Sequence, residues 1–164
     1  MAKPDPTSAE DLKDGIKHVC YEYANLISAA HWSIKGQAPW RTNVDDAFLL
    51  GYRKLRDFLL KDERSRWEAD ILASDYLAPG FARTWTLPTW ECEWQAVMDK
   101  QLAHITFERG KEWDHRKWVP QLEGEMRIAW GKFFDVVDPQ YKPEFIKQLD
   151  FCQKKPGFFG KLAL

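Results

Sequence analysis

The chain has 164 residues, of which 45% are hydrophobic and 30% charged, and its formal net charge is −1. This composition is typical of one soluble globular domain and excludes a fibrous or largely disordered protein. The small net charge provides no broad positive field, so nonspecific nucleic-acid binding has no electrostatic driving force. We expect a single helical domain over residues 1–164, with flexibility confined to residues 1–6 and about 153–164.

The cysteines and the apolar segments indicate a compartment. Cys20, Cys92 and Cys152 are few, odd in number and without zinc-site spacing, which argues against disulfides and a structural metal. The N-terminal residues lack the apolar core of a signal peptide, and apolar runs elsewhere are only a few residues long. We therefore expect reduced, packed cysteines in a cytoplasmic protein that does not enter a membrane.

The first predicted element is a long amphipathic helix. Thr7 and Glu10 have the spacing of a capping box, and apolar residues from Leu12 onward recur at three- and four-residue steps on one face. Gly36 and Pro39 are expected to end this helix.

A second helix is predicted from Asn43, acting as its cap, to about Asp62. Its apolar face includes Gly51, which would let another helix approach closely. The opposite face carries leucines beside charged residues, a pattern typical of a partner surface: Leu49, Leu50, Leu60, Arg53, Arg56 and Asp57.

The rest of the chain is also predicted to be helical. A short helix is expected over residues 67–77, followed by a turn at APGF. Pro88 suits the first turn of a third long helix that reaches about Arg109. The fourth is expected from about Trp118 to Val137, and a last short helix over PEFIKQLDF (143–151). The predicted fold is all-α, an up-and-down four-helix bundle with one or two additional short helices.

The aromatic residues divide into two groups. Four tryptophans fit apolar helix stripes and are assigned to the core, and the phenylalanines of the C-terminal tail are expected to dock on the bundle rather than to bind a partner. Five others lie off those stripes and are candidates for lining a pocket or an interface: Trp32, Trp40, Trp67, Trp85 and Trp113.

No metal or cofactor site is predicted. A di-metal bundle needs two Glu-x-x-His pairs, whereas this chain has one, from Glu112 to His115. Pairs such as His18 with Glu22 are more typical of ordinary hydrogen bonds than of metal ligation. Glycine-rich phosphate-binding loops are absent from the sequence.

Arginine and histidine come together in RGKEWDH, where Arg109 and His115 have the spacing Arg-x5-His. With this motif and the segments YRKLRDFLL (52–60), ADILASDYL (69–77) and DKQLAHITFERG (99–110), the chain resembles the HEPN superfamily of small α-helical bundles. The resemblance spans residues 43–118. It implies a homodimer and, in the active members, a metal-independent ribonuclease whose arginine and histidine meet across the dimer seam.

On that resemblance Arg109 would hold the scissile phosphate of RNA and His115 would perform acid–base chemistry. Arg53, Asp57 and His104 are the accompanying candidate binding residues. Structural roles are the alternative: a buried, hydrogen-bonded imidazole for His104, a helix-end charge for Arg109 and an exposed ion pair for Arg53 with Asp57.

Two main functions therefore remain open at the level of sequence, and binding of a small ligand or a metal between helices is a weaker third. The first is cleavage or binding of RNA at a homodimer seam formed by the outward face of the second helix and part of the third. The second is a noncatalytic homodimeric module for protein interaction. No cofactor is expected in either.

Overall fold

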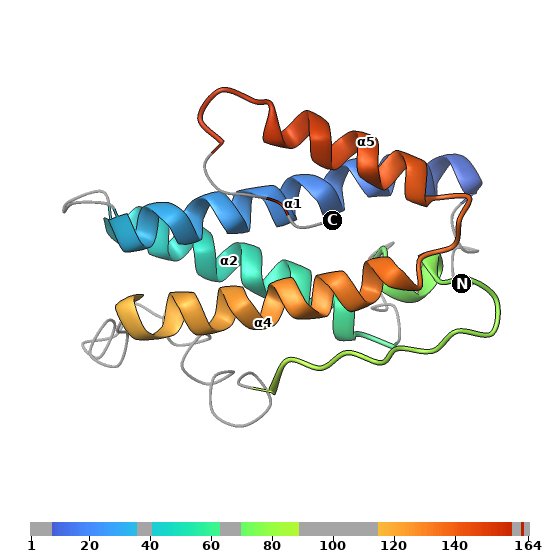
Figure 1. Cartoon of the computed structure of the whole chain (residues 1–164), viewed down its shortest axis with the longest axis horizontal. Coiled ribbons are helices and arrows are strands. Elements are labelled where there is room, and N and C mark those ends of the chain that lie inside the picture. The colour runs from blue at the N-terminus through green and yellow to red at the C-terminus, as the bar shows by residue number, and fades with distance from the viewer. Residues whose placement is uncertain (1–7, 36–40, 63–69, 89–114, 159–161, 163–164) are drawn as a thin grey trace, which may run out of the picture.

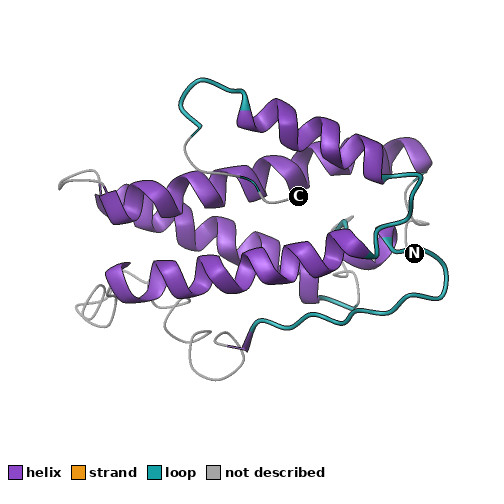
Figure 2. Cartoon of the chain, viewed as in Figure 1, coloured by secondary structure: helices purple, strands orange, loops and turns teal. Residues whose placement is uncertain are grey.

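The structure, a computed structural model, describes residues 8–35, 41–62, 70–88, 115–158 and 162. Figure 1 shows four α-helices and a short 3-10 helix in this part of the chain: α1 (Ala9–Lys35), α2 (Arg41–Leu60), η1 (Ala73–Tyr76), α4 (His115–Asp135) and α5 (Lys142–Gln153). These described ranges contain no β-strand (Figure 2), although one isolated antiparallel bridge joins Leu77 to Val137. The prediction of an all-α bundle is confirmed.

Helix α1 lies at the centre of the bundle and packs against α2, α4 and α5. Helices α2 and α4 run in one direction, and α1 and α5 run in the opposite direction (Figure 1). The predicted third long helix lies outside the described residues, except that Pro88 is helical as expected. None of the described helices is long and apolar enough to cross a bilayer.

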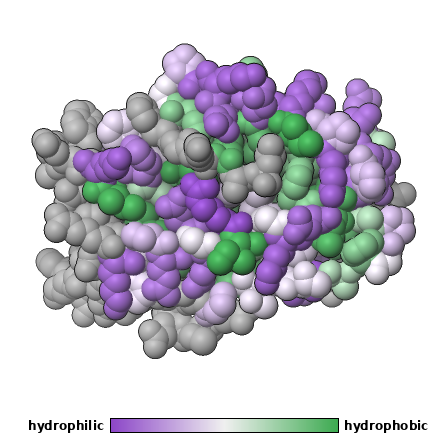
Figure 3. Space-filling model, in the orientation of Figure 1, coloured by the Kyte–Doolittle hydropathy of each residue, from purple (hydrophilic) through white to green (hydrophobic). Residues whose placement is uncertain are grey.

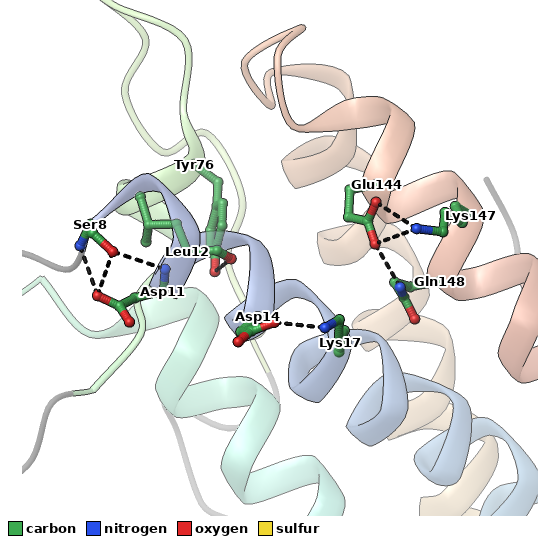
Figure 4. Close-up of polar contacts among 9 residues, drawn as sticks. All are labelled: Ser8, Asp11, Leu12, Asp14, Lys17, Tyr76, Glu144, Lys147 and Gln148. Atoms are coloured by element: carbon green, nitrogen blue, oxygen red, sulfur yellow. Dashed lines mark hydrogen bonds and ion pairs between the residues drawn. The ribbon is translucent and has the colours of Figure 1, made fainter.

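A capping box fixes the start of α1 (Figure 4). The Asp11 amide donates to Ser8 Oγ at 3.2 Å, and the Ser8 amide donates to the Asp11 carboxylate at 2.9 Å. The prediction placed this box on Thr7 and Glu10, one residue too early, because serine and aspartate satisfy the same reciprocal geometry. The other end agrees with the prediction, since α1 ends at Lys35, directly before Gly36.

Other helix boundaries differ from the predicted ones. Helix α2 begins at Arg41, so Asn43 lies inside the first turn instead of capping it. Helix α4 begins at His115, three residues before Trp118, and contains Pro120 in its second turn. In the described part of the predicted helix over 67–77, helical structure is limited to η1, whose turn is closed by the Leu72 amide bonding the Asp75 carboxylate at 2.8 Å.

The core is rich in aromatic side chains. The Trp130 ring stacks on Tyr23 with 4.2 Å between centroids, and Phe133 and Phe145 pack edge-on beside it. Trp85 is also buried, and it lines a hollow with Leu60 and Arg83, so its expected position at a pocket is confirmed. Its indole Nε1 donates to the Leu59 carbonyl at 3.1 Å, which satisfies a backbone group at the end of α2.

The C-terminal tail docks on the bundle, as predicted. Helix α5 covers the predicted segment 143–151 and buries Phe145 against α1 and α4. After it, Gly157 adopts a φ of +84°, and the turn brings Phe158 back against the core. Leu162 is buried there as well. Phe151 is the exception, because its side chain is exposed.

Gly15 of α1 lies against Ile71 and against Tyr76 of η1. A Cβ atom there would clash with Ile71 Cδ1 and lie 2.6 Å from the Tyr76 hydroxyl, which donates to the Leu12 carbonyl at 2.8 Å (Figure 4). We expect Gly15→Ala to lower the free energy of unfolding by about 1–3 kcal/mol through overpacking, although alanine is the better helix former.

Gly124 provides the matched control, because a Cβ atom at this position in α4 would meet nothing within 4 Å. Gly124→Ala should raise the free energy of unfolding by about 1 kcal/mol. Urea unfolding followed by circular dichroism measures both variants. If Gly15→Ala were as stabilising as Gly124→Ala, the tight contact with η1 would be contradicted.

Candidate functional site

A groove runs along the outer surface between α1 and α2 and encloses about 490 Å³. We call it the α1–α2 groove; its principal lining residues are Tyr21, Asn25 and Trp32 of α1 and Ala47, Leu50 and Lys54 of α2. Three of these are large apolar side chains that remain exposed: Tyr21 at 48%, Trp32 at 41% and Leu50 at 48%. Exposed apolar groups gathered in a concave surface are typical of an interaction site.

The close approach of the two helices forms the floor of the groove. Gly51 lies against Leu26, so that a Cβ atom on Gly51 would be 3.5 Å from Leu26 Cβ. The prediction that this glycine lets another helix approach is therefore confirmed. Both residues are buried, and the flanking side chains rise on either side of them.

Polar contacts tie α1 to α2 at both ends of the groove. At one end the Lys54 ammonium bonds the Glu22 carboxylate at 2.6 Å. At the other end the buried Ser33 hydroxyl donates to the Asp45 carboxylate. The Lys54 side chain stays 49% exposed in this pair, so the groove presents its apolar rings, Leu50 and the Lys54 ammonium to a partner.

The structure separates the three leucines that were expected on the outward face of α2. Leu49 is buried, which contradicts the prediction, because it faces the core from the flank of α2. Leu60 is half-buried, and Leu50 alone of the three is exposed as expected. The outward face of α2 therefore has a single large apolar side chain, Leu50, at its centre.

Arg53 and Asp57 lie one turn apart on α2, next to the groove. Arg53 is exposed, whereas the half-buried Asp57 bonds Arg56 and also Lys61, whose Nζ is 3.3 Å from its carboxylate. Partial burial favours the neutral amine of Lys61, but the carboxylates of Asp57 and Asp70 outweigh it and raise its pKa. Asp57 thus belongs to a local ion-pair network at the C-terminal end of α2.

The remaining predicted site residues lie elsewhere or outside the description. His104 and Arg109 fall outside the described residues, as does the side chain of His115. His115 begins α4 and lies ten residues before Glu125. At 1.5 Å per residue, the backbone of His115 therefore lies about 15 Å along α4 from Glu125. Burial raises the pKa of Tyr52 of α2, and the charge of Glu125 raises it further.

A second hollow lies between α1 and α5, and its lining residues are mostly charged or polar. Its lining includes Lys17, Lys147 and Lys154 around the exposed ring of Phe151. Each lysine bonds an acid of its own helix; the Lys17–Asp14 pair, at 2.6 Å, and the Lys147–Glu144 pair are drawn in Figure 4. The hydrogen bond from Lys17 lowers the pKa of Asp14.

Figure 3 shows a face of the molecule with many hydrophilic side chains and separate hydrophobic areas.

The described residues contain no group of three or more His, Cys, Asp or Glu side chains arranged for a metal ion. Glu22, which sequence spacing pairs with His18, bonds Lys54 instead. Cys20 and Cys152 are free and buried, as expected of packing residues, and burial raises the pKa of the Cys20 thiol.

Sequence reasoning found part of the groove. Trp32 was among the tryptophans expected at a pocket or interface, and the structure confirms that position. Tyr21 was missed. The signal was a stripe on α1 at steps of four, three and four residues, but its two middle positions are polar: Tyr21, Asn25, Ser28 and Trp32.

Comparisons with known proteins found no similar one, whether by family models, among curated proteins or among solved structures. The resemblance to the HEPN superfamily therefore stays an expectation from the motifs of the sequence.

Proposed function

We propose that this protein is a noncatalytic interaction module that pairs with a second copy of itself through the α1–α2 groove. The observation that carries the proposal is Leu50, which is 48% exposed in the middle of the otherwise polar outward face of α2 and lies beside the exposed rings of Tyr21 and Trp32. Removing such side chains from water is the main favourable term in association.

Magnitudes favour a partner that buries all three side chains. Burying one exposed leucine completely contributes about 1.5–3 kcal/mol, whereas association costs at least about 4 kcal/mol in lost translation and rotation. Leu50 alone cannot offset that cost. In a two-fold interface every residue is buried twice, so Tyr21, Trp32 and Leu50 contribute six apolar side chains. A second copy therefore supplies enough apolar surface without any further component.

RNA cleavage or RNA binding at a dimer seam is the other hypothesis. It rests on Arg109 and His115, with Arg53, Asp57 and His104 as binding residues. Arg53 and Asp57 adjoin the α1–α2 groove, and the other three are not described beyond the backbone of His115. This function stays a prediction from the resemblance.

Sedimentation equilibrium tests the proposed association. The 19.3 kDa chain should sediment with a mass that rises toward twice that value as its concentration increases. This change from monomer to dimer should persist in the presence of a chelator, because the burial of apolar surface drives the association. A mass that stays at one chain up to millimolar concentration would overturn the proposed function.

A further inference from the structure

The outward face of α2 has a regular stripe that continues the α1–α2 groove. Its residues recur at steps of four and three, as in the contact positions of a coiled coil: Asn43, Ala47, Leu50, Lys54 and Asp57. Leu50 is the middle member. The small, exposed Ala47 beside it leaves room for another helix to approach.

Charges on this face are ordered along the helix. The acidic Asp46 precedes Leu50 by four residues, and the basic Lys54 follows it by four, with Arg53 beside Lys54. Opposite charges at equal distances from a central apolar residue are complementary to their own reversed copy. In a copy that runs in the same direction, each charge would instead face a like charge and repel it.

We infer that two copies pack α2 against α2 in antiparallel orientation, with a two-fold axis at Leu50. This inference rests on the proposed self-association and specifies its surface and register. In this arrangement Leu50 meets the partner's Leu50, and Asp46 lies opposite the partner's Lys54 on both sides of the axis. Parallel packing would set Asp46 against Asp46 and Lys54 against Lys54, which is repulsive.

The register of α1 on α2 supports the same arrangement. Contacts of Glu22 with Lys54 and of Ser33 with Asp45 place Trp32 near the level of Asp45. A partner helix lying antiparallel to α2 runs parallel to α1 and brings its basic end to this level. The exposed ring of Trp32 then faces the partner's Lys54, a favourable cation–π pairing.

Leu50→Glu tests the surface, because it places two carboxylates on the axis. We expect the dissociation constant of the dimer to rise at least about tenfold, since two leucines, each 48% exposed in the free chain, are lost from the interface. Phe151→Glu is the matched control, because Phe151 is a comparably exposed apolar residue on α5, away from the groove. It should leave the dissociation constant unchanged. Circular dichroism verifies that both variants are folded.

Two charge reversals test the register. Asp46→Lys and Lys54→Glu should each weaken self-association about tenfold or more, because each opposes like charges twice. Since Lys54→Glu also breaks the pair with Glu22, circular dichroism verifies that both variants are folded. An equimolar mixture of the two variants should form a heterodimer. In it, the new lysine at position 46 of one chain faces the new glutamate at position 54 of the other chain, and the unmodified Lys54 of the first faces the unmodified Asp46 of the second. Sedimentation of each variant alone and of the mixture measures this.

The outcomes separate the inference from the proposed function. A wild-type dimer that Leu50→Glu leaves intact would retain self-association but overturn the assignment to α2. A dimer that Leu50→Glu breaks, while neither charge reversal weakens it, would overturn the antiparallel register. A wild-type monomer would remove the proposed function itself. Loss of association in both single variants with recovery in their mixture supports the full inference.

Discussion

Phe133→Ala is expected to lower the free energy of unfolding by about 3–5 kcal/mol, the range observed when a buried phenylalanine is truncated. The side chain is completely buried in α4. Its ring contacts four others edge-on, with centroid distances of 5.3 Å to Phe58, 5.7 Å to Trp85, 5.6 Å to Trp130 and 5.7 Å to Phe145. Truncation leaves a cavity where α2, α4, α5 and the Trp85 segment meet, and rigid rings cannot collapse into it.

The neighbouring residue is the matched control for this loss. Phe134 has the same side chain on the same helix, but it is only partly buried, and its ring lies 6.3 Å from Phe145. We expect Phe134→Ala to cost about 1 kcal/mol. Urea unfolding of both variants at one temperature gives the comparison. Equal losses would show that the aromatic cluster is not centred on Phe133.

The elements that could be predicted are those whose apolar residues repeat locally. Helices α1, α2 and α5 follow from steps of three and four residues, because a helix facing a core needs that spacing whatever covers it. Helix boundaries were harder to predict. The pair Ser8 and Asp11, which forms the capping box of α1, has the same spacing and chemistry as the predicted pair Thr7 and Glu10.

Features that depend on neighbouring elements could not be predicted. Leu49 lies on the flank of α2, so its burial depends on what packs beside that flank. Trp85 lies in a segment without helical periodicity, and its indole finds the Leu59 carbonyl through tertiary contact. The α1–α2 groove likewise combines stripes from two helices, and each stripe alone looks like a solvated face.

Alkaline pH is expected to destabilise the fold through tyrosines that are buried in their neutral form. Burial raises the pKa of Tyr23 to about 12, and the nearby Arg127 offsets only part of this. In the unfolded chain a tyrosine has a pKa of about 10. Burial also raises the pKa values of Tyr52 and Tyr76.

The direction of the pH effect follows from proton binding. Below pH 10 the Tyr23 hydroxyl is protonated in both states, and its full contribution to stability is present. As the pH rises from about 10 to 12, the unfolded chain loses the proton while the folded chain retains it, so unfolding becomes progressively more favourable. A difference of about two units corresponds to about 3 kcal/mol for Tyr23 by pH 12.

Tyr23→Phe isolates this contribution, because phenylalanine keeps a ring against Trp130, 4.2 Å away in the native stack, and cannot ionise. Urea unfolding at pH 9 and pH 11.5 should show a smaller loss of stability in the variant than in the wild type. The residual slope then belongs to Tyr52, Tyr76 and the surface charges. An identical pH dependence in the two proteins would mean that the Tyr23 hydroxyl reaches water in the folded state, and the stacked core between α1 and α4 would have to be open at that point.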